Sequence, residues 1–178
     1  MKQKLEKGFL QVYTGNGKGK STAAIGQAVR AAGYGLKTYF VMFMKEFPYN
    51  EVKSLEKLKD FLTIVQVGKD DFVYKKVPPS EEEKSKIKNA LAEAKGKMLS
   101  GEYDLIILDE IFVSIYFGLV SKEEVIFFVT EKPQSVELIL TGRYCPQEIV
   151  DKADLVTEMK EVKHYYEKGV LARKGIES

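Results

Sequence analysis

The sequence predicts an α/β fold with a mostly parallel central sheet, because short apolar runs alternate along the chain with helical patterns. A glycine-rich stretch follows the first apolar run directly, and a later apolar run ends in two adjacent carboxylates. The order of strand, glycine-rich loop and helix is the one that a nucleoside triphosphate site requires. These observations together predict a sheet built around a phosphate-binding loop.

The first predicted strand, Phe9–Tyr13, leads into the glycine-rich loop of residues 14–22. Glycines allow successive backbone N–H groups to turn inward and surround phosphate oxygens. The predicted helix that follows, from Ala23 to Val29, directs its positive N-terminus toward the bound anion. A glycine-rich turn without a ligand is the alternative, and the flanking strand and helix disfavour it.

Individual residues of this loop have expected roles in nucleotide binding. Lys20 is expected to reach the phosphates, and the Ser21 hydroxyl to bind Mg²⁺. Gly19 through Ser21 match the end of the general P-loop pattern, whereas Thr14 stands where that pattern has its first glycine. The residues predicted to bind the nucleotide are Thr14, Gly15, Asn16, Gly17, Lys18, Gly19, Lys20, Ser21 and Thr22.

Further strands are expected at residues 37–44, 62–67, 104–108, 136–141 and 155–159. The run Leu105–Leu108 is continuously apolar, which is typical of a central strand covered on both faces. In open parallel sheets, ligands bind at the carboxyl ends of the strands. The polar residues that follow each strand are therefore the candidates for the site.

Asp109 and Glu110 directly follow the central apolar strand. In P-loop proteins an acid at such a place helps to hold Mg²⁺, which prefers oxygen ligands. We therefore predict that Ser21, Asp109 and Glu110 bind the metal. Adjacent residues of an extended chain point to opposite faces, so the two carboxylates should differ in role. The alternative is that Asp109 only caps the helix that follows.

Arg143 follows another strand end, in the sequence Thr141-Gly142-Arg143. Its planar guanidinium group is suited to clamping phosphate oxygens. A surface ion pair is the alternative.

A long helix is expected after Ser80, because Ser80 and Glu83 have the spacing of a capping box. Acidic residues 81–83 then complement the helix dipole rather than bind a metal. The preceding segment, residues 68–79, is both polar and aromatic, and is either a loop over the site or a connector that buries Phe72 and Tyr74. The predicted apolar stripe of the helix is Ile87, Ala90, Leu91, Ala94 and Met98.

Composition limits the class of protein. The chain has 178 residues, 44% hydrophobic and 30% charged, and we expect one domain over residues 1–178. A net charge of +2 does not call for a nucleic-acid partner. The sequence has no run of 18 apolar residues, so no membrane span is expected. The only cysteine, Cys145, excludes an intrachain disulfide and suits a reducing, cytoplasmic location.

These motifs resemble the P-loop ATP:cob(I)alamin, or corrinoid, adenosyltransferases. The resemblance extends over residues 8–177, and the loop form with Thr14, Asn16 and Lys18 is typical of that family. It implies a three-layer RecA-like fold, a homodimer, and transfer of the 5′-deoxyadenosyl group of ATP to the cobalt(I) of a corrinoid with release of triphosphate. The stretches that support it are residues 14–24, 108–110, 141–143, 153–159 and 162–177.

The resemblance also implies roles for single residues. Phe72 and Tyr74 match an aromatic pair that shapes the corrinoid pocket of the family. Lys20, Arg143 and Glu110 are the residues expected to support catalysis. The product would be adenosylcobalamin or an adenosylated precursor such as adenosylcobinamide or adenosylcobyrinate. A reductase that supplies cobalt(I) is the expected protein partner.

The chemistry of this reaction agrees with the residues present. Cobalt(I) is itself the nucleophile, so the protein needs neither a nucleophilic side chain nor a general base. The triphosphate leaving group needs cations, which Lys18, Lys20, Arg143 and Mg²⁺ would supply. The first alternative is a P-loop kinase or ATPase of unknown substrate, which would release diphosphate instead. The second is a non-enzymatic nucleotide-gated module or a RecA-like nucleic-acid motor, although the chain lacks a basic stripe.

Overall fold

The computed structural model describes residues 4–47, 49–69 and 77–177. Its centre is a six-stranded sheet in which every neighbouring pair is parallel. The order across the sheet is β3-β2-β4-β5-β1-β6, so β5 separates the loop-bearing strand β1 from the acidic strand β4. The strands are β1 (Leu10–Thr14), β2 (Thr38–Phe43), β3 (Leu62–Val67), β4 (Leu105–Asp109), β5 (Glu137–Thr141) and β6 (Leu155–Glu158).

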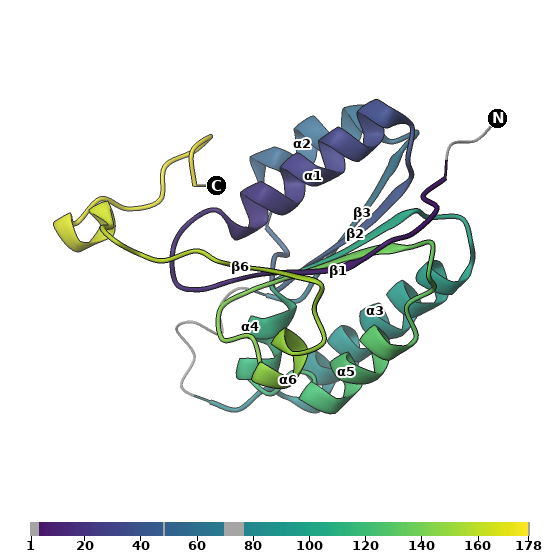
Figure 1. Cartoon of the computed structure of the whole chain (residues 1–178). Coiled ribbons are helices and arrows are strands. Elements are labelled where there is room, and N and C mark those ends of the chain that lie inside the picture. Colours follow the sequence, from purple (N-terminus) through teal and green to yellow (C-terminus); the bar gives the residue numbers. More distant parts are fainter. Residues whose placement is uncertain (1–3, 48, 70–76, 178) are drawn as a thin grey trace.

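Helices cover both faces of the sheet, which gives three layers (Figure 1). On one face lie α1 (Lys20–Tyr34) and α2 (Asn50–Leu55), which continues into the 3₁₀ turn η1 (Glu56–Leu58). On the other face lie α3 (Glu81–Leu99), α4 (Ile111–Tyr116), α5 (Lys122–Thr130) and α6 (Gln147–Val150). The α/β class and the parallel sheet are confirmed, and each predicted strand is found with its ends shifted by at most one residue.

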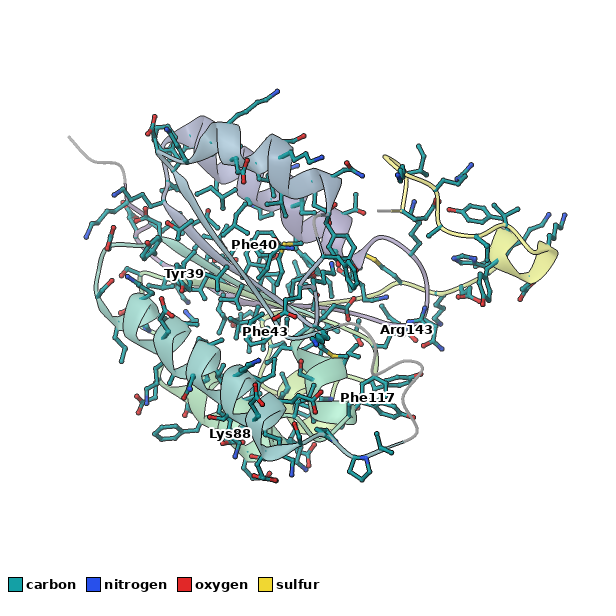
Figure 2. All side chains as sticks on the ribbon, turned by 180° about the vertical axis from the view of Figure 1, so that it is seen from behind. Tyr39, Phe40, Phe43, Lys88, Phe117 and Arg143 are labelled. Carbon is teal, nitrogen blue, oxygen red and sulfur yellow. The ribbon has the colours of Figure 1, made fainter. Side chains whose placement is uncertain are left out.

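Two apolar clusters hold the layers together. Along β2 every residue is buried, and alternate side chains enter opposite clusters. Phe40 packs on the α1 side with Ala24 and Ala28, whereas Tyr39 and Phe43 pack on the α3 side (Figure 2). A strand buried on both faces has the continuous apolar sequence that the central runs show.

Helix α3 begins as predicted, and its whole predicted apolar stripe is buried. Both hydrogen bonds of the capping box are present, since the Ser80 side chain accepts from the backbone N–H of Glu83 and the Glu83 carboxylate accepts from that of Ser80. Glu81, Glu82 and Glu83 all lie in the first turn, where they complement the helix dipole.

We expect Ser80→Ala to lower the free energy of unfolding by about 1 kcal/mol, because one backbone N–H of the first turn loses its acceptor. Urea denaturation followed by circular dichroism measures the change. Ser85→Ala, at an exposed position of the same helix, is the matched control. An equal loss in both variants would show that the cap does not stabilise the helix.

No helix in the described ranges is long and apolar enough to cross a membrane.

Candidate active site

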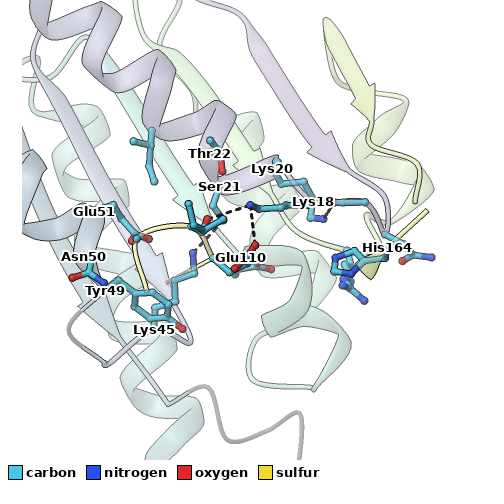
Figure 3. Close-up of a pocket in the computed structure, with 18 of the residues that line it drawn as sticks. Lys18, Lys20, Ser21, Thr22, Lys45, Tyr49, Asn50, Glu51, Glu110 and His164 are labelled. Carbon is cyan, nitrogen blue, oxygen red and sulfur yellow. Dashed lines mark hydrogen bonds and ion pairs between the residues drawn. The ribbon is translucent and has the colours of Figure 1, made fainter. Parts of the chain in front are cut away.

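A cavity of about 670 Å³ opens at the carboxyl ends of the strands, where the sequence predicts the site. Figure 3 shows residues from the loop after β1, the start of α2, the segment after β2, the end of β4 and the C-terminal segment. A further lining residue, Arg143, follows β5. It is lined by residues 16–22, Ile25, Lys45, residues 49–51, Ser54, Glu110, Arg143, His164 and residues 175–177.

Two glycines give the loop after β1 its shape. Gly15 and Gly19 have φ angles of 93° and 125°, which side-chain-bearing residues rarely adopt. The backbone N–H of Gly17 donates to the carbonyl oxygen of Met159 at 2.7 Å. A Cβ atom on Gly15 would lie 2.5 Å from that same oxygen. The segment after β6 therefore supports the loop from outside, and larger residues at Gly15 would push the two apart.

Lys20 is buried at the first position of α1. Its Nζ donates to the carbonyl oxygens of Gly15 and Gly17, each at 2.8 Å. Burial lowers the pKa of Lys20, and the neighbouring carboxylate of Glu110 opposes that shift. In the part of the chain that the structure describes, the hydrogen bonds of this ammonium group go to neutral carbonyls, so it is ready to take a negatively charged partner.

Asp109 and Glu110 occupy different environments, as their adjacent positions predict. Asp109 is fully buried, and its Oδ1 accepts a hydrogen bond of 2.6 Å from the hydroxyl of Thr141. Glu110 lines the cavity and has a φ angle of 60°, in the left-handed region that is strained for a non-glycine residue. Burial and the nearby Asp109 raise the pKa of Glu110.

The alternative role for Asp109, as a helix cap, is wrong. The N-cap position of α4 belongs to Glu110, and no side chain caps that helix by a hydrogen bond. Thr141 instead connects the two strand ends, because its hydroxyl donates to Asp109 and accepts from the backbone N–H of Glu110 at 3.0 Å. Thr141 therefore holds the carboxylate of Asp109 in a position to bind a cation rather than to cap the helix.

Lys45 is a functional candidate that the sequence motifs do not reveal. Its Nζ lies 2.7 Å from Oδ2 of Asp109 and 3.1 Å from Oγ of Ser21. Burial opposes the charged form, but the ion pair with Asp109 outweighs it and raises the pKa of Lys45. Because Lys45 follows β2 at the carboxyl edge of the sheet, the tendency of ligands to bind at strand ends could have identified it.

Ser21 and Asp109 fit a metal site, because their oxygens already converge on one cation. In the described part of the chain, no three His, Cys, Asp or Glu side chains form a cluster that could hold a metal alone. Mg²⁺ at phosphate sites typically takes only one or two carboxylates, with phosphates and water as its other ligands. The two oxygens and the nearby Glu110 therefore suit a metal that arrives with a nucleotide.

The cations predicted for the phosphates lie around the same cavity. Arg143 lines it, and among the residues described the guanidinium group has no carboxylate within 4.0 Å, so the surface ion pair is not found. Lys18 donates to the carbonyl oxygen of Ile176 at 3.1 Å and pairs with Glu177 at 3.6 Å. The C-terminal segment therefore contacts the loop directly.

His164 also lines the cavity, and its Nδ1 accepts from the backbone N–H of Tyr166 at 3.1 Å, which caps the 3₁₀ turn η3 (Tyr165–Lys168). Thr14 and Gly15 are not lining residues, and the Thr14 hydroxyl accepts from the backbone N–H of Cys145 at 3.4 Å. Phe72 and Tyr74 lie outside the described residues.

The parallel sheet, with a glycine-rich loop between β1 and α1 and carboxylates at the end of β4, defines the class of P-loop α/β proteins. A solved structure with a similar fold is the flagellar accessory protein FlaH from Methanocaldococcus jannaschii, at a TM-score of 0.59 and 16% identity. The likeness covers 86% of this chain and 72% of that one.

The family is more specific than the class. A family model described as ATP:corrinoid adenosyltransferase BtuR/CobO/CobP matches residues 6–178. The corrinoid adenosyltransferase of Escherichia coli K12 is 34% identical, over 97% of this chain and 86% of its own. The corrinoid adenosyltransferase of Pseudomonas aeruginosa is 30% identical, over 97% of this chain and 84% of its own. The chain belongs to the corrinoid adenosyltransferase family, as the motifs predict.

Proposed function

We propose that this protein transfers the 5′-deoxyadenosyl group of ATP to the cobalt(I) of a corrinoid and releases triphosphate. The observation that carries the proposal is the cavity in which Lys18, Lys20, Arg143 and Glu110 meet at the glycine-rich loop. Such a site provides the positive charge that a triphosphate leaving group needs. Membership of the family supports the corrinoid as the acceptor.

Neither the histidine nor the cysteine of the chain is needed as a nucleophile or base. The chain has one histidine and one cysteine. His164 accepts a backbone hydrogen bond at a turn, and burial raises the pKa of the Cys145 thiol to about 12. A reaction in which the substrate cobalt(I) attacks a saturated carbon needs neither group, because no proton has to be removed.

Nucleotide binding exchanges the partners of two lysines. Lys20 leaves the carbonyls of Gly15 and Gly17 for phosphate oxygens, and Lys18 leaves Ile176 and Glu177. Arg143 approaches the phosphate chain from the end of β5. As negative charge moves onto the departing triphosphate, these cations stabilise it more strongly than they stabilise bound ATP, and this difference accelerates the reaction.

Ser21, Asp109 and Glu110 would hold Mg²⁺ in the proposed site. The ion would neutralise part of the charge of the triphosphate. Ser21 and Glu110 line the cavity, whereas Asp109 lies behind them and is fixed by Thr141.

The acceptor side of the site rests on the sequence resemblance. On that ground Phe72 and Tyr74 are proposed to shape the corrinoid pocket. Residues 163–177 are proposed to form another wall of the site, because of their glycines at positions 169 and 175 and their mixed aromatic and basic content. His164 and residues 175–177 line the cavity, which supports the second assignment.

The protein is further proposed to act as a cytoplasmic homodimer that receives electrons from a reductase. The C-terminal segment extends away from the sheet (Figure 1) and exposes apolar residues such as Val162, at 93%. An exposed apolar arm suits contact with a second copy. Light scattering measures the mass directly.

Product analysis tests the proposed reaction. We expect the protein, incubated without oxygen with ATP, Mg²⁺ and chemically reduced cobalamin, to release inorganic triphosphate in amounts equal to the adenosylated corrinoid. Anion-exchange chromatography separates triphosphate from diphosphate. Release of diphosphate in place of triphosphate would support the P-loop kinase or ATPase instead.

A further inference from the structure

We propose that Lys45 is a displaceable cation of this site. Its ammonium group occupies the place between Ser21 and Asp109 that a divalent cation takes with the nucleotide, and it then turns to the phosphate oxygens. The inference rests on the proposed function, because it assigns a further phosphate-binding cation to the same metal and phosphate site.

The contacts of Lys45 place one positive charge between the two oxygens. Its Nζ lies 2.7 Å from Oδ2 of Asp109 and 3.1 Å from Oγ of Ser21. Figure 3 shows Lys45 and Ser21 in the cavity. The side chain of Lys45 is 12% exposed and that of Asp109 is 0% exposed, so water screens neither charge effectively. The sequence independently predicts both oxygens as metal ligands. The ammonium group therefore stands between the two predicted metal ligands.

The ammonium group cannot keep this place once a divalent cation binds Ser21 and Asp109. Two positive charges would then lie at contact distance in a nearly buried site, where their repulsion is only weakly screened. Glu110 and Glu51 contribute negative charge near Lys45, and the Tyr49 ring lies 5.4 Å from its Nζ. Lys45 therefore has other stabilising neighbours while it leaves Ser21.

The backbone of Lys45 is held by a neighbouring side chain, so only the side chain of Lys45 would have to turn. The side-chain amide of Gln66 donates to the carbonyl oxygens of Lys45 and Phe47, each at 2.8 Å. Lys45 lines the same cavity as Lys18, Lys20 and Arg143. A rotation of its side chain alone thus brings a fourth cation to the triphosphate.

A purely structural role predicts something different. If Lys45 only neutralises the buried Asp109, its loss disturbs the carboxylate and weakens binding of metal and phosphate alike. A displaceable cation competes with the metal and attracts the phosphates, so its loss changes the two affinities in opposite directions. The sign of the change in metal affinity distinguishes the two roles.

The test compares Lys45→Met with the wild-type protein, using Mn²⁺ and inorganic triphosphate as probes. We expect Lys45→Met to bind Mn²⁺ about tenfold more tightly without nucleotide, and to bind triphosphate with Mg²⁺ about tenfold more weakly. Electron paramagnetic resonance of free Mn²⁺ and titration calorimetry measure these values. Lys53→Met, at an exposed position of α2, is the control that should change neither.

Equal or weaker Mn²⁺ binding by Lys45→Met, including no binding by either protein, would overturn the proposal. Circular dichroism checks that the variant folds. If it does not, Lys45→Gln serves in its place, because its amide still donates to Asp109. Loss of the fold in both variants would also contradict the proposal, since a displaceable cation is not required by the folded state.

Ser21→Ala separates this inference from the function on which it rests. If Ser21→Ala binds Mn²⁺ and ATP as the wild-type protein does, the metal site itself is wrong. If Ser21→Ala weakens Mn²⁺ binding while Lys45→Met leaves it unchanged, only the role of Lys45 is wrong.

Discussion

Replacing Lys20 with alanine is expected to abolish adenosyl transfer while the protein stays folded. The ammonium group of Lys20 is buried at the base of the cavity and is held by two neutral carbonyls, which phosphate oxygens replace on binding. Loss of one aimed charge-stabilising donor typically reduces a rate by about 10²–10³. Lys20 also contributes to ATP binding, so the fall in kcat/KM should exceed that range.

Steady-state kinetics with reduced cobalamin and ATP measures the effect of Lys20→Ala, and circular dichroism measures the fold. Lys18→Ala is the matched control, because its side chain is 45% exposed and already pairs with Glu177. We expect a smaller loss for Lys18→Ala. Near-normal turnover of Lys20→Ala would refute the assignment of residues 14–22 as the phosphate-binding loop.

Asp109→Ala is expected to give the largest loss of stability of any substitution in the site. It leaves the charge of Lys45 without its closest partner and the Thr141 hydroxyl without its acceptor. Breaking a buried ion pair from one side costs about 3–5 kcal/mol. We expect about 3 kcal/mol, the lower end of that range. Glu110 remains near Lys45 and is itself relieved of repulsion from Asp109.

Urea denaturation with and without the substitution measures this loss. Asp109→Asn is the comparison variant, since its side-chain oxygen still accepts from Thr141, whereas its amide NH₂ replaces the oxygen that accepts from Lys45. The loss should be smaller in Asp109→Asn than in Asp109→Ala. A cost below about 1 kcal/mol for Asp109→Ala would mean that water reaches Lys45 and that the pair is not a buried one.

Much of the fold could be predicted because its signals are local. Each strand is a short apolar run bounded by polar or turn residues, and α3 begins at a capping box that is recognisable in the sequence. The start of α5 carries the same local signal, because Ser121 and Glu124 form a second capping box, but that helix is not among the elements predicted from the sequence. The short helices α4 and α6, of 6 and 4 residues, have too few turns for a recognisable period.

The site was predictable wherever it follows strand ends, and less so where it depends on contacts between distant segments. Loop residues 16–22, Glu110 and Arg143 line the cavity as expected, whereas Thr14 and Gly15 do not. The ion pair between Lys45 and Asp109 joins residues 64 positions apart, and no local pattern encodes it. The contact of Lys18 with Ile176 spans 158 positions and depends on where the C-terminal segment comes to lie.

The different roles of Asp109 and Glu110 could also be assigned only from the structure. Alternation along a strand predicts that they face opposite ways, but it does not say which one reaches the nucleotide. The left-handed backbone at Glu110 turns that residue toward the cavity and leaves Asp109 buried against Thr141. A strained residue at the end of a strand is typical of functional sites.

Transfer of the adenosyl group itself tests the proposed function most directly. The experiment mixes the protein without oxygen with ATP labelled in its adenosine moiety, Mg²⁺ and chemically reduced cobalamin, and follows both the visible spectrum and the label. We predict that the spectrum changes to that of an alkylcobalamin and that the label appears on the corrinoid. Hydrolysis of ATP to diphosphate, with no spectral change and no label on the corrinoid, would contradict adenosyl transfer.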